Sequence, residues 1–141
     1  MKVNKIIIAL VSFIFLQVGS LYAEVSYTFK VKNTEFIGSV EKEKGGKKTI
    51  SFVGIPFAEP PVGDLRWKAP REIDKYPDTF PATTLPNRCM QVSNFYDEMD
   101  GIEGGSIIGS EDCLYLNIYL SEKAYNSKEK LPVVFWIHGG G

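Results

Sequence analysis

The sequence predicts an incomplete α/β fold in which antiparallel N-terminal strands lead into a central sheet. Three patterns indicate this fold. The first part of the chain has short runs of β-branched and aromatic residues with partial alternation, a later run alternates strictly, and a continuous apolar run near the end leads into glycines. Alternation is typical of strands with one buried face, whereas a continuous apolar run is typical of a central strand covered on both faces.

The first 23 residues, Met1 to Ala23, have the pattern of a secretory signal peptide. Two lysines precede an apolar run from Ile6 to Leu16. This run is shorter than the roughly 20 apolar residues that a membrane-spanning helix needs. Cleavage after Ser20 is a close alternative to cleavage after Ala23, and an uncleaved anchor is a third reading. We expect a secreted protein whose folded part is residues 24–141, with no membrane contact beyond the signal peptide.

Charge and composition exclude several classes of partner. The chain carries 16 basic and 17 acidic residues, and its lysine cluster from Lys42 to Lys48 is interrupted by Glu43 and two glycines. A basic stripe of the kind that binds nucleic acid is therefore not expected. With two cysteines and His138 as the single histidine, the sequence does not reach the ligand count of a structural zinc site. We expect no metal and no cofactor.

Five segments in the first half of the chain predict its local structure. Tyr27–Val31 and Glu35–Val40 have the pattern of short strands, and Lys44–Lys47 supplies a Gly-Gly turn after which Thr49–Val53 pairs back as a hairpin partner. The proline-rich stretch Gly54–Gly63 predicts an ordered, extended loop and excludes a helix, because proline fixes φ and removes a backbone donor.

The second half of the chain predicts a disulfide-closed loop and two strands. Cysteines in the secretory pathway favour pairing, so Cys89 and Cys113 are expected to bond to each other and to close a surface loop. Leu114–Leu120 alternates as a strand with one buried face, and Ser121–Lys130 is polar and loop-like. Val133–Ile137 is the uniformly apolar run, which predicts a central strand.

The glycine run that follows this last strand is the candidate site. His138-Gly139-Gly140-Gly141 stands at the carboxyl end of the predicted strand, the edge at which open α/β sheets place ligands. Successive N–H groups without nearby Cβ atoms can stabilise a developing oxyanion, and such a motif occurs in lipases and esterases. A plain turn and a phosphate cradle are the alternatives. His138 is either a general base or a residue that orients the loop.

Three blocks in this order resemble the type-B carboxylesterase and cholinesterase family. The resemblance extends from about Asn33 to Gly141 and rests on the glycine run together with two earlier stretches. They are Gly54-Ile55-Pro56-Phe57-Ala58 through Pro60-Pro61-Val62-Gly63 and Leu65-Arg66-Trp67, and Glu111-Asp112-Cys113-Leu114-Tyr115-Leu116-Asn117-Ile118-Tyr119.

The resemblance implies a fold and a set of structural residues. The chain is similar to the N-terminal portion of an α/β-hydrolase fold, cut before the nucleophile. Cys89 and Cys113 match the cysteines of the family's first disulfide loop. Arg66 and Glu111 match a partly buried structural ion pair that joins the proline-rich loop to the base of the disulfide loop.

The resemblance also implies a reaction. Gly140 and Gly141 match the two glycines whose N–H groups form the family's oxyanion hole, whereas the nucleophilic serine, the acid and the base match no residue of this chain. We expect a serine carboxylesterase acting on small-molecule carboxylic esters in the full-length parent, and an inactive fragment when the chain is alone. The disulfide loop lacks the tryptophan with which cholinesterases bind choline, since Phe95 and Tyr96 are its only aromatics, so neutral esters are the expected substrates.

Two other functions stay open at this point. The family includes adhesion proteins that keep this fold and have lost the catalytic serine, and these proteins bind partner proteins. Residues 24–141 could also form a stable secreted protein with an unrelated binding role. A Gly-x-Ser-x-Gly segment downstream would favour the enzyme.

Overall fold

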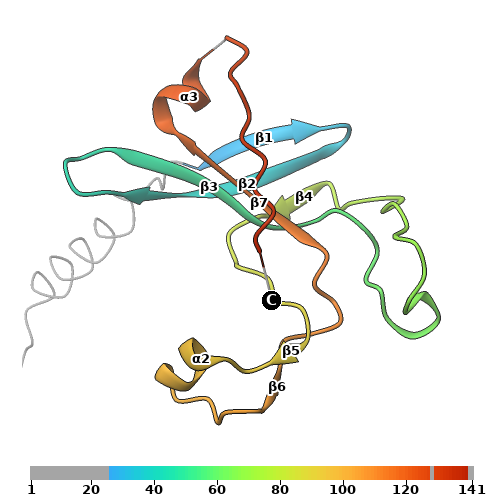
Figure 1. The fold of residues 1–141 in the computed structure, drawn as a ribbon. Helices are drawn as coiled ribbons and strands as arrows, with labels where there is room; N and C mark the ends of the chain where they lie inside the picture. Colours follow the sequence, from blue (N-terminus) through green and yellow to red (C-terminus); the bar gives the residue numbers. More distant parts are fainter. Residues whose placement is uncertain (1–25, 128, 140–141) are drawn as a thin grey trace, which may run out of the picture.

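The computed structural model describes residues 26–127 and 129–139, so the predicted signal peptide lies outside the described residues. Within them, a five-stranded sheet has the order β1-β2-β3-β7, with β4 paired to β2, and a separate two-stranded sheet joins β5 to β6. Figure 1 shows the small sheet and helix α2 on one side of the main sheet and helix α3 on the opposite side. Among the described residues, no helix has both the length and the apolar character needed to cross a membrane.

The predicted antiparallel strands at the N-terminus are confirmed: the first has the predicted bounds, and the next two are longer than the pattern indicated. They are β1 (Tyr27–Val31), β2 (Thr34–Lys42) and β3 (Lys48–Pro56). β1 pairs antiparallel with β2, and β2 pairs antiparallel with β3. The turn between β2 and β3 contains Gly45 at φ 90° and Gly46 at φ 78°, conformations that glycine adopts without steric cost.

The proline-rich stretch is irregular, as predicted, but it begins later than the sequence suggested. β3 continues to Pro56, and the extended chain beyond it contains the single 3-10 turn η1 (Gly63–Leu65). Further on, β4 (Thr79–Pro81) runs parallel to β2. The segment from β4 to Ala82 lies between β2 and β3, because Ala82 N donates to Ile37 O at 2.7 Å and Val53 N donates to Ala82 O at 2.9 Å.

β7 (Tyr115–Ser121) confirms the predicted alternating strand and pairs antiparallel with β3. The register places Phe52 opposite Ile118 and then shifts before Ile55, which marks a bulge in β3. Gly54 lies in the bulge at φ 72°, and its N–H donates to Asn117 Oδ1 at 2.9 Å. Glycine adopts this conformation without steric cost.

The hydrophobic core lies on one face of this sheet. Ile50 is completely buried and Phe52 is 2% exposed. The other buried members are Tyr27, Phe36, Ile55 and Ala82, and the partly buried residues packed against them are Phe29, Val40, Tyr76, Phe80, Leu116, Leu120 and Tyr125. Phe29 stacks on Phe36 at a centroid distance of 4.9 Å and meets Phe52 edge to face at 4.7 Å. Aromatic packing of this kind adds to the stabilisation from burial.

The prediction of a loop over Ser121–Lys130 is wrong for its first half, which forms helix α3 (Glu122–Asn126). Ser121 caps the helix, since its Oγ accepts a hydrogen bond from Ala124 N at 3.1 Å. Contacts across the sheet hold the helix in place: Glu122 Oε1 accepts hydrogen bonds from Tyr27 at 2.6 Å and from Lys48 at 2.7 Å. Polar composition alone did not reveal this anchoring.

The prediction of a covered central strand over Val133–Ile137 is wrong for the described structure. These residues have no regular secondary structure, and their side chains are 79% to 89% exposed. A strand exists only where a neighbour satisfies its backbone groups. No segment among residues 26–127 and 129–139 pairs with this run, so its strand-forming composition is not realised.

Candidate functional site

The glycine run is described only in part. The oxyanion-hole residues predicted from the sequence, Gly140 and Gly141, lie outside the described residues. His138 and Gly139 are exposed, and His138 Nδ1 lies 2.9 Å from Gly139 O. A ring nitrogen that carries the proton would donate to this carbonyl. In this arrangement the His138 ring contacts the backbone of its own loop.

The two predicted cysteines form a disulfide. Cys89 and Cys113 are bonded, with their Cα atoms 5.0 Å apart. The two ends of the loop are also joined through their backbones next to the disulfide, because Ser110 N donates to Arg88 O at 2.9 Å. Gly109 precedes this contact at φ 93°, and a Cβ built on it would lie 2.5 Å from Arg88 O. The close approach of the two ends therefore requires glycine at position 109.

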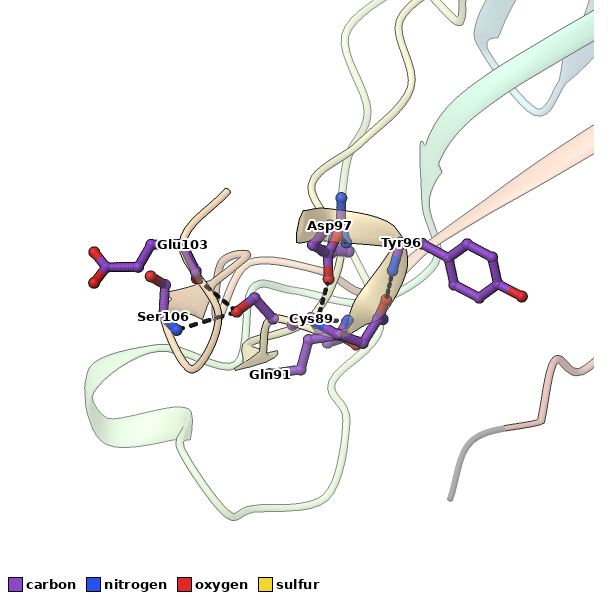
Figure 2. Close-up of polar contacts among 9 residues, drawn as sticks. Cys89, Gln91, Tyr96, Asp97, Glu103 and Ser106 are labelled. Carbon is purple, nitrogen blue, oxygen red and sulfur yellow. Dashed lines mark hydrogen bonds and ion pairs between the residues drawn. The ribbon is translucent and has the colours of Figure 1, made fainter. Parts of the chain in front are cut away.

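The loop between the cysteines contains a short, capped helix. Strands β5 (Gln91–Val92) and β6 (Ile107–Ile108) pair antiparallel and flank α2 (Phe95–Met99). Asn94 caps the helix: its Oδ1 accepts from Tyr96 N at 2.9 Å, while Asn94 N donates to Asp97 Oδ2 at 2.8 Å. Figure 2 shows these contacts beside those of Glu103 and Ser106. This reciprocal capping satisfies backbone donors at the start of the helix.

Asp97 is the buried carboxylate of the loop, and the sequence analysis missed it. Its side chain is 4% exposed and forms an ion pair with Arg88. The backbone hydrogen bond from Asn94 N, followed by the contact with Arg88, lowers the pKa of the Asp97 carboxyl below its usual value in spite of desolvation. The spacing Asn94-Phe95-Tyr96-Asp97 was a signal that could have found it, because a capping residue followed three positions later by an acceptor marks a helix start.

Hydrogen bonds of a buried serine side chain connect the two halves of the loop. Ser93 Oγ donates to Glu103 O at 2.9 Å and accepts from Ser106 N at 3.1 Å. Phe95 and Tyr96, the two aromatics of the loop, are 67% and 75% exposed. The ring of Tyr96 points away from the loop (Figure 2). The rigid backbone of the loop thus presents aromatic side chains to solvent.

An ion pair joins the proline-rich loop to the second half of the disulfide loop. Arg66 Nη2 donates to Glu111 Oε2 at 2.6 Å, with side chains 53% and 34% exposed. Glu111 raises the pKa of the Arg66 guanidinium, first through the hydrogen bond and then through its charge. The contact expected from the resemblance is present, but it is more exposed than the expected partly buried pair. Pairs of this exposure contribute little to stability and mainly fix geometry.

The described part of the chain holds no cluster of metal ligands. No group of three or more His, Cys, Asp or Glu side chains among these residues is arranged to hold a metal ion. What the arrangement offers is a covalently closed loop and a proline-rich loop tied to it, both upstream of the exposed residues His138 and Gly139.

The antiparallel sheet, the loop closed by Cys89 and Cys113 and the glycine segment are consistent with the N-terminal part of an α/β-hydrolase protein. A sequence model of the carboxylesterase family matches residues 26–141. The chain belongs to the carboxylesterase family.

Individual relatives agree with this assignment. The chain is 41% identical over 105 residues to juvenile hormone esterase of Tribolium castaneum. This match covers 74% of the chain and 16% of that protein. It is 34% identical over 128 residues to cholinesterase of Mus musculus, covering 87% of the chain and 20% of the relative. It is 43% identical over 101 residues to acetylcholinesterase 1 of Caenorhabditis briggsae, and this match covers 68% of the chain and 16% of the relative. The chain thus spans 16% to 20% of the length of these relatives.

Proposed function

We propose that the protein is a serine-type carboxylic ester hydrolase and that this chain supplies its oxyanion-hole loop through Gly140 and Gly141. The family match over residues 26–141 carries the proposal, because it includes the glycine run together with the two blocks that precede it. The relatives named above are an esterase and two cholinesterases, so ester hydrolysis is the reaction common to them.

The chemistry assigns one part of the reaction to this chain. A serine oxygen attacks the ester carbonyl carbon while a histidine accepts the serine proton, and the carbonyl oxygen becomes an oxyanion. The N–H groups of Gly140 and Gly141 donate hydrogen bonds to that oxyanion. The serine, the acid and the histidine of the triad match no residue of this chain, so the chain alone does not turn over ester.

Neutral esters are the proposed substrates. No tryptophan lies between Cys89 and Cys113, and a cationic ammonium group binds best on an indole face. The rings of Phe95 and Tyr96 pack edge to face at a centroid distance of 5.8 Å and are exposed. We therefore expect an uncharged acetate ester to have at least a tenfold higher kcat/KM than a choline ester with the same acyl group.

Secretion is part of the same proposal. The disulfide between Cys89 and Cys113 fits an oxidising compartment, where such bonds persist. The apolar run after the first lysines fits a signal peptide that directs the chain there. Mass spectrometry of the protein recovered from culture medium tests this point. A mature N-terminus at Glu24 or Leu21, left by cleavage after Ala23 or Ser20, supports secretion. A protein that keeps Met1 and stays in the cell fraction contradicts it.

Activity is tested on the protein expressed from its complete transcript. We expect hydrolysis of phenyl acetate, and covalent labelling and inhibition by an organophosphate, whereas the 141-residue chain gives neither. The absence of both hydrolysis and labelling in the complete protein would overturn the proposal and favour a non-catalytic member of the family.

The role of the glycines is tested in the same protein. Gly140→Pro removes a backbone donor, and we expect kcat to fall roughly 100-fold or more with a small change in KM. Gly139→Ala is the matched control, because nothing lies within 4 Å of a Cβ added there and Gly139 is not an assigned donor. Equal losses in the two variants would contradict the assignment of Gly140.

A further inference from the structure

A hollow of about 480 Å³ opens on the core face of the main sheet. It lies between the β1–β2 turn and the segment before β4, and its floor is apolar. The floor residues are Phe29, Phe36, Ile55, Leu116 and Ile118. A volume in the range of roughly 300 to 1,000 Å³ suits a small-molecule ligand. Neither His138 nor Gly139 is among the lining residues.

The rim of the hollow carries a positive charge. Lys32 and Lys75 line it from opposite segments, with Asp74 as the single acidic residue of the lining. Both lysines are exposed, and within the described part of the chain neither forms an ion pair. Two ammonium groups beside an apolar floor are complementary to a molecule with an apolar body and one anionic end.

The backbone at Lys32 has an unusual conformation. Lys32 has φ 53°, the left-handed conformation that non-glycine residues rarely adopt. Glycine or asparagine would make this two-residue turn at lower cost. Strained residues of this kind cluster at active sites and ligand clamps, and here the side chain lines the hollow.

We infer that this hollow binds a free fatty-acid carboxylate. The acyl chain lies along the apolar floor, and the carboxylate accepts hydrogen bonds from the ammonium groups of Lys32 and Lys75. A second hollow in the described structure has the opposite chemistry: Glu41 lines it among hydroxyl side chains, and no lysine does. Charge therefore selects the first hollow for an anion. The inference is independent of the proposed ester hydrolysis.

Calorimetry with three amphiphiles of equal chain length tests the sign of the charge. We expect the complete protein to bind decanoate, below its micelle concentration, roughly tenfold more tightly than 1-decanol, because a charge-assisted hydrogen bond replaces a neutral one. Decyltrimethylammonium should bind less tightly than 1-decanol. Equal affinity for all three would overturn the proposal. Binding to phosphatidylglycerol vesicles without binding of free decanoate would overturn it as well, in favour of a membrane surface.

Two lysine variants locate the site. Lys32→Gly and Lys75→Gln should each weaken decanoate binding roughly tenfold and leave 1-decanol binding unchanged. Lys32→Gly should also keep or raise the Tm, since it removes the strained φ, so lost binding cannot be attributed to misfolding. Lys44→Gln, at an exposed lysine in the β2–β3 turn, is the control and should bind normally. Ester hydrolysis should be the same in all three variants. Unchanged decanoate binding in both lysine variants, or a concentration-dependent dimer that excludes decanoate, would overturn the inference.

Discussion

The five-stranded sheet and the loop between Cys89 and Cys113 bury different kinds of side chain. In the sheet, the most buried residues are apolar, with Ile50 and Phe52 at the centre. In the loop, whose residues are all described, the two buried side chains are the polar Ser93 and Asp97. Six large apolar residues of the loop are exposed, and Ile102 and Ile108 are half-buried. The exposed ones are Met90, Val92, Phe95, Tyr96, Met99 and Ile107.

The difference in buried side chains determines how the stability of each region responds to mutation, redox state and pH. Apolar burial is non-directional and is shared among many contacts, so a sheet of this kind depends on volume and packing. The loop depends on a covalent bond and a few directional hydrogen bonds, so it depends on redox state, backbone conformation and pH.

Replacing one phenylalanine in each region should give the largest contrast. Phe52→Ala removes a buried ring and should lower the free energy of unfolding by about 3–5 kcal/mol, because it loses transfer free energy and leaves a cavity. Phe95→Ala removes an exposed ring and should change it by about 0.5 kcal/mol or less. Urea unfolding followed by circular dichroism measures both. Similar losses in the two variants would show that the loop, too, is stabilised by apolar packing.

Removing the disulfide should destabilise the loop and leave the sheet folded. The double variant Cys89→Ser with Cys113→Ser releases a loop that spans 24 positions. On the loop-entropy model the bond stabilises the fold by about 3–4 kcal/mol. Limited proteolysis should then cut between residues 89 and 113, while hydrogen exchange of the β2–β3 amides stays slow. Loss of protection in the sheet at the same rate would mean that the two regions unfold together.

A pair of glycine variants tests the base of the loop against its tip. Gly109→Ala should destabilise the loop by about 2–3 kcal/mol, because a Cβ there meets Arg88 O at 2.5 Å in addition to requiring a positive φ. Gly105→Ala also has a positive φ, 80°, but its Cβ has open space. It should cost only about 1 kcal/mol. Hydrogen exchange of Ser110 N reports the difference, and equal effects would contradict the close approach at Gly109.

The elements that the sequence predicted well are those whose partners are close in the chain or whose pattern is strict. β1, β2 and β3 form consecutive hairpins, and β7 alternates without interruption. Local chemistry decides such elements, because turn glycines and period-2 alternation act over a few residues. The disulfide was predictable for a different reason, since two cysteines allow one internal pairing.

The elements that the sequence did not predict depend on contacts between distant segments. α3 is anchored by Tyr27 and Lys48, residues far from Glu122 in the sequence. The hollow beneath the β1–β2 turn combines residues from β1 to β7. Val133–Ile137 shows the converse: its composition favours a strand, but a strand also needs a neighbour, which a local pattern cannot supply.

As the pH falls, the loop between Cys89 and Cys113 should lose stability before the sheet does. We expect this to be the smallest of the four effects. The pKa of Asp97 is lowered in the folded chain, so this carboxylate contributes stability that is fully present above its unfolded value of about 4 and is lost as the pH falls below that. Glu122 also has a lowered pKa, through hydrogen bonds from Lys48 and Tyr27. Acid should therefore also loosen α3, whereas the apolar contacts around Ile50 do not titrate.

Hydrogen exchange between pH 6 and pH 3, corrected for intrinsic rates, measures this order. The amides of α2 should lose protection first, and those of β2 and β3 last. Asp97→Asn is the matched control, because an amide has no charge to lose, and it should make the protection of α2 independent of pH over this range while lowering it at pH 6. If Asp97→Asn kept the acid sensitivity of the original chain, the sensitivity would belong to another carboxylate. The loop would then be stabilised at its helix cap by geometry alone rather than by charge.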